Sequence, residues 1–179
     1  MKLGYSVFGA VTITLAASLT GLAGNAEAVT PRPAASESHE IVNRDAYTQC
    51  MDFGSNAPGT VVGLYHCYSG GSQLWTDTFG LPDPYSDNKI RSVLNGMCMD
   101  LQSNNIGAPI VLSECRDGYT SQSWYLEVPQ DEPANTSYRL IVNDNGLCAD
   151  IGSINPGTPV TMAICRIGYK SQEWSFRYQ

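Results

Sequence analysis

Short apolar runs follow one another along the chain from about residue 39 to its end. They are rich in β-branched and aromatic residues, and many alternate polar with apolar positions, which is typical of strands. The segments between them, such as SNAPGT, SNNIGAP and SINPGTP, contain the Gly, Pro and Asn residues that favour turns. No stretch after residue 40 has a sustained helical period. The pattern therefore predicts an all-β domain of short strands.

The runs recur in three copies. Gly-Tyr-x-Ser-Gln-x-Trp occurs at 118–124 and again at 168–174, and a third Gln-x-Trp lies at 73–75. Each Gln-x-Trp follows a pair of cysteines 17 positions apart, and the pairs recur about every 50 positions, which is the spacing of a repeat architecture. Four runs in each of three copies predict twelve strands. In chain order within a copy the runs are HEIVN, KIRSV or YRLIVN; CMDF, CMDL or CADI; TVVGLYHC, PIVLSEC or PVTMAIC; and QLWTDTF, QSWYLEV or QEWSFRY.

The N-terminal residues have the pattern of a secretory signal. Lys2 precedes an apolar run at 7–22, and Ala-Glu-Ala at 26–28 offers small residues at the two positions that a signal peptidase recognises, so we expect cleavage after Ala28. The alternative is a membrane anchor, for which the run is marginal in length and broken by Gly and Thr.

The sequence thus predicts a secreted, extracellular protein with no membrane span after cleavage. It assigns a signal peptide to 1–28, a flexible Pro-, Ala- and Ser-rich leader to 29–40 and one domain to 41–179. The repeats, called copies one, two and three below, lie at about 41–80, 88–130 and 137–179.

Composition and charge exclude some functions. The formal net charge is −7, from 10 Lys and Arg against 17 Asp and Glu, and there is no basic run, so nucleic acid is an unsuitable partner. Apolar residues make up 42% of the chain, which favours an ordered domain over disorder.

Six cysteines in a secreted chain indicate disulfides, for which 15 pairings are possible. Because the same spacing occurs three times, we expect each pair to close within its copy, which stabilises the fold by about 3 kcal/mol for each loop. A metal site is the weaker alternative, since there is no Cys-x-x-Cys and only His39 and His66 would add ligands; no metal or cofactor is expected. The expected disulfides are Cys50–Cys67, Cys98–Cys115 and Cys148–Cys165.

Three copies of Cys-x-Asp, a second Cys and Gln-x-Trp resemble the ricin B-type (R-type) lectin domain, also called carbohydrate-binding module family 13. The resemblance covers about 41–179 and implies a β-trefoil of three pseudo-equivalent four-stranded repeats. It also implies that the tryptophans Trp75, Trp124 and Trp174 form a structural core, and that the glutamines Gln73, Gln122 and Gln172 bond to backbone or brace a nearby carboxylate within the binding sites.

The resemblance implies one shallow sugar site per copy. Its carboxylate is the Asp two residues after the first Cys, and its aromatic platform stands two residues before the second Cys. All copies have the carboxylate, but Tyr65 is the one aromatic at the platform position, where copies two and three have Ser113 and Ala163. The candidate carboxylates are Asp52, Asp100 and Asp150.

The remaining polar positions of the implied site depart from the family pattern. The residue four before the second Cys is Gly63, Val111 or Thr161, and a serine (Ser72, Ser121 or Ser171) stands where the family has Asn. Tyr119 and Tyr169, three residues before the Gln, are candidate replacements for the missing platforms. The structural alternatives are a carboxylate that ties a turn and a tyrosine that braces a surface loop.

No G-x-S-x-G, H-E-x-x-H or phosphate-binding loop occurs, so an enzyme is not expected. The favoured function is a secreted lectin that recognises glycan or polysaccharide units, galactose-type foremost, with copy one most intact. The alternative is a non-catalytic delivery subunit of a secreted bacterial toxin, similar to the ricin-type subunits of cytolethal distending toxin, with degenerate sugar sites and a toxin partner subunit. A protease-inhibitor trefoil is a third possibility, for which the sequence offers no signature.

Overall fold

The computed structural model describes residues 37–77, 79 and 87–179. The predicted signal peptide and residues 29–36 of the predicted leader lie outside the described residues. In the described ranges, no helix has the length and apolar character that a membrane crossing needs.

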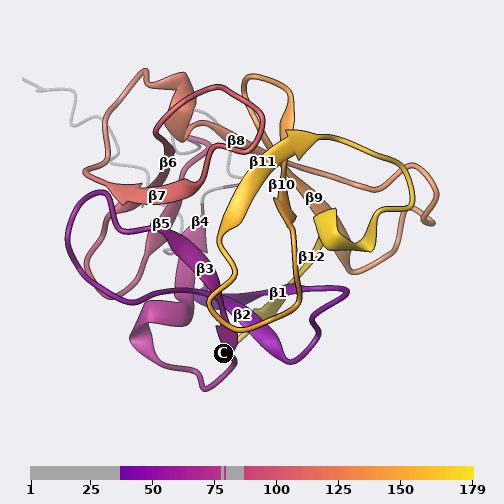
Figure 1. Ribbon diagram of the computed structural model, residues 1–179, viewed down its shortest axis with the longest axis horizontal. Helices are drawn as coiled ribbons and strands as arrows, with labels where there is room; N and C mark the ends of the chain where they lie inside the picture. Colours follow the sequence, from indigo (N-terminus) through magenta and orange to yellow (C-terminus); the bar gives the residue numbers. More distant parts are fainter. Residues whose placement is uncertain (1–36, 78, 80–86) are drawn as a thin grey trace, which may run out of the picture. The chain divides into compact units, whose positions relative to one another are not determined.

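The described residues form an all-β domain, as the sequence predicts, with twelve strands and three short 3₁₀ turns (Figure 1). Copy one contains β1 (His39–Asn43), β2 (Gln49–Phe53), β3 (Val62–His66), η1 (Gly71–Gln73) and β4 (Leu74–Asp77). Copy two contains β5 (Ile90–Ser92), β6 (Cys98–Leu101), β7 (Ile110–Ser113), η2 (Thr120–Gln122) and β8 (Trp124–Glu127). Copy three contains β9 (Tyr138–Asn143), β10 (Leu147–Ile151), β11 (Val160–Ile164), η3 (Lys170–Gln172) and β12 (Glu173–Tyr178).

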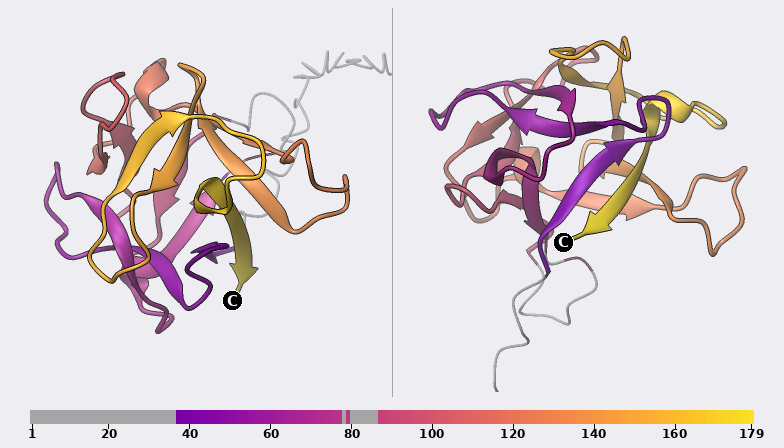
Figure 2. Two further views of the ribbon diagram at one scale, coloured as in Figure 1. Left: turned by 45° about the vertical axis from the view of Figure 1, so that its right-hand side comes forward. Right: turned by 90° about the horizontal axis from the view of Figure 1, so that it is seen from below.

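The first and fourth strands of the copies form a barrel. Neighbours pair in the order β5-β4-β1-β12-β9-β8, all antiparallel. The amide of Trp124, at the start of β8, donates to the carbonyl of Asn88 just before β5 at 2.8 Å, which closes the ring. The second and third strands form three hairpins, β2–β3, β6–β7 and β10–β11, and the two views of Figure 2 show these hairpins arranged around one end of the barrel.

The three hairpins are joined in a cycle by their turns. The amides of Gly59, Gly107 and Gly157 donate to the carbonyls of Leu112, Met162 and Leu64 at 2.7, 2.7 and 2.6 Å, so each turn binds the next copy and the third binds the first. These glycines have φ angles of 84°, 83° and 85°, a left-handed conformation that residues with a Cβ avoid. This explains why a Gly recurs in the turn sequences.

Three tryptophans dominate the core. Trp75, Trp124 and Trp174 are completely buried, and each indole Nε1 donates to the carbonyl of a buried residue in its own copy. Buried indoles need such a partner, because an unpaired N–H would cost free energy. The partners, at 3.2, 3.1 and 3.1 Å, are Met51, Met99 and Ala149.

The predicted disulfides are confirmed. Cys50–Cys67, Cys98–Cys115 and Cys148–Cys165 each join the second strand of a copy to the residue or two after its third strand. Each bond therefore fixes the point at which the chain leaves the hairpin and enters the loop before Gln-x-Trp.

Two local predictions differ from the structure. The glutamines of Gln-x-Trp end the 3₁₀ turns η1, η2 and η3 and do not begin the following strands, because their side chains bond back to the preceding loop. His39 and Glu40, which the sequence assigned both to the leader and to the first apolar run, are buried in β1, where His39 pairs with Tyr178 of β12. Burial lowers the pKa of His39, whose Nε2 lies 3.3 Å from an Asp77 carboxylate oxygen.

Candidate functional site

Each candidate aspartate is braced from behind in the same way. One carboxylate oxygen of Asp52 accepts from the amide of Phe53 at 2.6 Å, and the other accepts from Nε2 of Gln73 at 2.9 Å. Asp100 and Asp150 have the equivalent bonds to the next amide and to Gln122 and Gln172. Because a carboxylate accepts about four hydrogen bonds, this bracing orients the group and leaves lone pairs for a ligand.

The glutamines Gln73, Gln122 and Gln172 are 0% exposed, so they stand behind the carboxylates and do not reach the surface. In copy one, Nε2 of Gln73 also donates to the carbonyl of His66 at 2.8 Å, and its Oε1 accepts from the amide of Tyr68 at 2.9 Å. The same amide bond is made by Arg116 in copy two and by Arg166 in copy three, each at 2.8 Å. Tyr68, Arg116 and Arg166 are therefore structurally equivalent.

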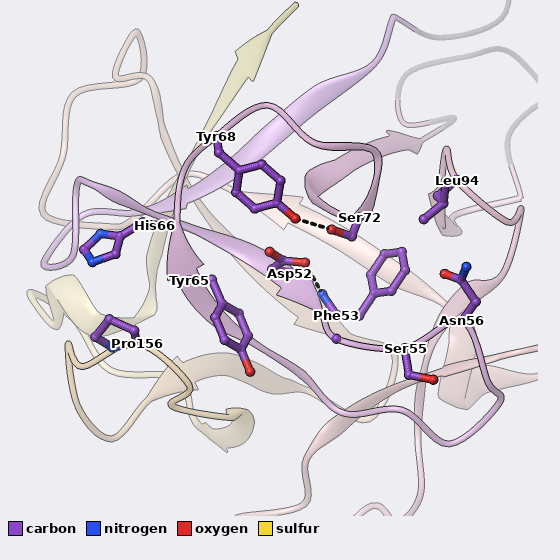
Figure 3. A pocket seen from close by; sticks show the side chains of 11 residues that line it. Asp52, Phe53, Ser55, Asn56, Tyr65, His66, Tyr68, Ser72, Leu94 and Pro156 are labelled. Carbon is purple, nitrogen blue, oxygen red and sulfur yellow. Dashed lines mark hydrogen bonds between the residues drawn. The ribbon is translucent and has the colours of Figure 1, made fainter.

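Copy one contains an open pocket of about 620 Å³ around its carboxylate (Figure 3). Most of its wall comes from β2, β3 and the loops of copy one, but Leu94 of copy two and Pro156 of copy three complete it. The pocket thus crosses the boundaries between copies. Its lining includes Asp52, Asn56, Tyr65, Tyr68, Leu94 and Pro156.

Two tyrosine rings stand beside Asp52 in this pocket (Figure 3). Tyr65, on β3, is 40% exposed, and Tyr68, in the loop after the disulfide, is 63% exposed. The Tyr68 ring lies over Gly70, where an added Cβ would approach its Cε2 to 2.0 Å, and its hydroxyl is 2.8 Å from the hydroxyl of Ser72. Copy one therefore presents two aromatic faces next to one carboxylate.

Copy one has Gly63, and so no side chain, at the position four before Cys67. A Cβ there would lie 3.0 Å from the carbonyl oxygen of Thr158 in copy three. That carbonyl accepts from the amide of Leu64 at 2.9 Å, so the close approach is part of the cycle of hairpins. No side chain from this position reaches the copy-one pocket.

In copy two, an arginine occupies the space beside the carboxylate. Nη2 of Arg116 lies 2.9 Å from an oxygen of Asp100, and its guanidinium carbon lies 3.9 Å from the centre of the Tyr119 ring. Burial raises the pKa of Asp100, but hydrogen bonds from Ser121, Gln122, Ser113 and Arg116 outweigh it, and the pKa is lower than usual. Tyr119 is thus the stacking partner of Arg116, and the polar Ser113 faces the carboxylate where copy one has the ring of Tyr65.

Copy three has an intermediate arrangement. Asp150 is braced by Gln172, and Arg166 lies beside Tyr169, with its guanidinium carbon 5.0 Å from the ring centre. Unlike the arginine of copy two, Arg166 makes no ion pair with a carboxylate among the described residues. Ala163 gives this site no aromatic wall at the position of Tyr65.

The sequence interpretation missed the roles of Arg116, Leu94 and Gly70. The signal for the first was present, because the residue directly after the second Cys is Tyr68 in copy one but an arginine in copies two and three. The contribution of Leu94 crosses a boundary between copies and leaves no pattern along the chain.

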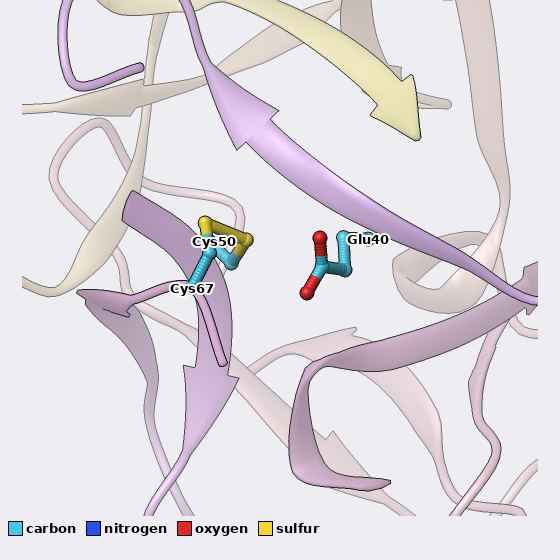
Figure 4. Close-up of side chains that lie close together, drawn as sticks. All are labelled: Glu40, Cys50 and Cys67. Atoms are coloured by element: carbon cyan, nitrogen blue, oxygen red, sulfur yellow. A yellow bond between two sulfur atoms is a disulfide. The ribbon is translucent and has the colours of Figure 1, made fainter. Parts of the chain in front are cut away.

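One cluster of potential metal ligands in copy one has another explanation (Figure 4). Glu40, Cys50 and Cys67 lie close together, but the two sulfurs are bonded to each other and are not thiolates. The carboxylate of Glu40 accepts from the amide and the hydroxyl of Ser69 at 3.0 and 3.1 Å. These bonds tie β1 to the loop that carries Tyr68, so the cluster is structural.

The twelve strands of the described residues and the three-fold cycle of their hairpins define a β-trefoil. The family model of the ricin-type beta-trefoil lectin domain matches residues 37–137 and 87–179. The chain belongs to this family, whose domains bind carbohydrate and are generally non-catalytic.

Solved structures agree on the fold. A designed three-fold symmetric protein, ThreeFoil, is 22% identical with a TM-score of 0.68, over 79% of this chain and 99% of that one. The Macrolepiota procera ricin B-like lectin in complex with lactose is 20% identical with a TM-score of 0.63, over 83% and 99%. A mosquitocidal holotoxin is 19% identical with a TM-score of 0.67 over 80% of this chain, which spans 17% of the toxin chain. No curated protein matches the chain. At these identities the likeness establishes the trefoil fold alone.

Proposed function

We propose that this protein is a secreted lectin that binds a galactose-type sugar in the copy-one pocket. The observation that carries the proposal is the braced carboxylate of Asp52 beside the exposed rings of Tyr65 and Tyr68. The lactose complex of the Macrolepiota procera lectin supports the choice of sugar, and the three disulfides support an oxidising compartment.

The chemistry of the pocket fits a pyranose. The free lone pairs of Asp52 accept hydrogen bonds from two neighbouring hydroxyls, and bonds to a charged acceptor are stronger than neutral ones. The face of Tyr65 packs against the C–H face of the ring, and Tyr68 forms a second wall. Ser72, whose hydroxyl meets that of Tyr68, offers a further polar contact at the rim. A few polar groups on an apolar shelf are the usual composition of a ligand site.

The three copies contribute unequally to binding in this proposal. Arg116 forms an ion pair with Asp100, the carboxylate of copy two, so a sugar would have to displace this ion pair and a cation–π contact there. Copy three keeps Asp150 but has no wall equivalent to Tyr65. Copy one is therefore the principal site, copy three is weaker and copy two is closed. The increase in affinity that simultaneous binding at all three sites would give is therefore limited.

The test is calorimetric titration of the purified protein with lactose, next to the variants Asp52→Asn, Asp100→Asn and Asp150→Asn. We expect Asp52→Asn to abolish most of the binding and Asp100→Asn to leave it unchanged. Equal loss with all three variants would contradict a principal site in copy one. A glycan array extends the search to other sugars.

The alternative function, a docking subunit of a toxin, is favoured by one observation, the ion pair that fills copy two. It predicts that no glycan binds and that a partner protein co-purifies from the culture medium of the source. Saturable binding of lactose that depends on Asp52 excludes it as the main function of the copy-one pocket.

A further inference from the structure

We propose that the copy-one pocket binds at least two consecutive sugar units, and that Leu94 of copy two, with Asn56 of copy one, holds the second. This inference rests on the proposed function of the same pocket. The volume of about 620 Å³ lies within the range of roughly 300–1,000 Å³ that is typical of pockets for drug-sized ligands, which are larger than one pyranose. A single ring on Tyr65 and Asp52 leaves the Leu94 end of the pocket empty (Figure 3).

Leu94 is an exposed apolar residue with a fixed position. It is 51% exposed, yet its amide donates to the hydroxyl of Ser92 at 3.2 Å and its side chain rests on Gly71, where an added Cβ would lie 3.2 Å from Cδ1. Gly71 belongs to η1 in copy one, so the contact holds Leu94 against the neighbouring pocket. A rigid apolar surface of this kind suits the C–H face of a second sugar ring.

Leu94 forms an apolar lip at the edge of the copy-one pocket, and comparison of the copies shows that the other two sites lack it. The equivalent positions follow from a shared hydrogen bond. In each copy, the residue before this position donates its amide to a carbonyl in the Gln-x-Trp segment of the preceding copy: Val93 to Leu74, Asp144 to Ser123 and Arg44 to Glu173. The positions equivalent to Leu94 are therefore Asn145 and Asp45, which are polar. Among the three sites, an apolar lip stands only beside the pocket that also has two aromatic walls.

The polar groups near the lip specify the kind of ligand. Asn56 lies at the same end of the pocket (Figure 3), and its amide can both donate to and accept from sugar hydroxyls. Among the described residues that line the pocket, Asp52 is the one carboxylate, and there is no lysine or arginine. A negative site on a chain of net charge −7 disfavours acidic sugars. The ligand class is a neutral oligosaccharide.

The test compares methyl β-D-galactoside with lactose by calorimetric titration of the full protein. The variant Leu94→Asn copies the polar residue of copy three, and Val93→Asn is the matched control, because Val93 is exposed to a similar degree in the same turn but does not line the pocket. We expect the unmodified protein to bind lactose about tenfold more tightly than the monosaccharide. Leu94→Asn should lose about fivefold in lactose affinity and keep its affinity for the monosaccharide, and Val93→Asn should change neither.

Three results would overturn the inference. Equal affinity for the two sugars means that the Leu94 end contributes nothing, although the single-sugar site stands. Equal weakening of both sugars by Leu94→Asn, with an unchanged circular dichroism spectrum, means that Leu94 acts on the first unit. Binding of neither galactoside overturns the proposed function itself, and the second unit with it.

Discussion

Arg116 forms an ion pair with Asp100 at 2.9 Å, in the place where copy one leaves the carboxylate of Asp52 open to the pocket. Both copies have the bracing glutamine and the disulfide. One difference that decides the state of the carboxylate is a single side chain, since Tyr68 occupies in copy one the position that Arg116 has in copy two.

Stability should depend on Asp100 in a particular pH range. Its pKa is lower in the folded chain than its ordinary value of 3.8, so its contribution to the free energy of unfolding is present above pH 3.8 and is lost as the pH falls through the lowered pKa. We expect Asp100→Asn to cost about 1–3 kcal/mol at pH 7, because a buried hydrogen-bonded charge is lost, and progressively less in acid. Urea unfolding at several pH values measures this.

The companion variant Arg116→Gln isolates the ion pair. It should move the pKa of Asp100 upward toward its ordinary value, as observed by NMR titration of the carboxyl carbon, because one of the hydrogen bonds that lower it is weakened. An unchanged pKa would show that Ser121, Gln122 and Ser113 set it without the arginine.

Tyr65→Ala should lower the affinity for lactose at least about tenfold, because the sugar loses its aromatic platform. The fold should be retained, since the side chain is 40% exposed and lies outside the buried core. Calorimetry and the circular dichroism spectrum measure the two effects. Tyr169→Ala makes the same substitution in copy three at 47% exposure, and it should leave lactose binding unchanged. Equal effects of the two variants would refute the assignment of the platform.

Gly70→Ala should weaken sugar binding by about threefold to tenfold without unfolding the protein. The φ angle of Gly70 is −76°, so alanine fits the backbone, but its Cβ would meet the Tyr68 ring at 2.0 Å and displace it from the pocket wall. Calorimetry and a thermal melt measure the outcome. Gly152→Ala is the control, since an added Cβ there has no neighbour within 4 Å. Undiminished binding by Gly70→Ala would mean that Tyr68 is not a wall of the site.

Trp124→Ala should lower the free energy of unfolding by about 3–5 kcal/mol, because it leaves a cavity in the core and removes the indole bond to Met99. Urea denaturation measures the loss. The neighbouring Tyr125→Ala, at a position 40% exposed, should cost less than about 1 kcal/mol. Similar losses for the two variants would contradict the central place of Trp124.

The fold was predictable because each of its determinants repeats along the chain. The spacing of Cys50 and Cys67 recurs twice, so the disulfide pairing followed from the sequence, and the apolar runs predicted all twelve strands of the described residues. The end of the leader was placed less well. His39 and Glu40 stood both in the first predicted strand and in the predicted leader, and the structure places them in β1, where His39 packs against Phe176 and Tyr178 of the last strand.

The candidate site was predictable only in part. The sequence identifies Asp52 and Tyr65 by their distance from the cysteines, but it does not show how far a long side chain reaches. The guanidinium of Arg116 turns back to Asp100, and Leu94 leans on Gly71 of another copy. Both contacts depend on side-chain direction and on the packing between copies, which linear spacing does not encode.

The cycle of hydrogen bonds through Gly59, Gly107 and Gly157 joins each hairpin to the next in the same way, so no copy is structurally first. Copy three supports copy one as directly as copy one supports copy two, and the amide of Gln179 meets the carbonyl of Ser38 at 3.2 Å, so the two ends of the domain are adjacent. A circularly permuted chain that starts at copy two would keep the same contacts. An isolated copy would lose both of its neighbours at once, and for this reason the three should melt together as one cooperative unit.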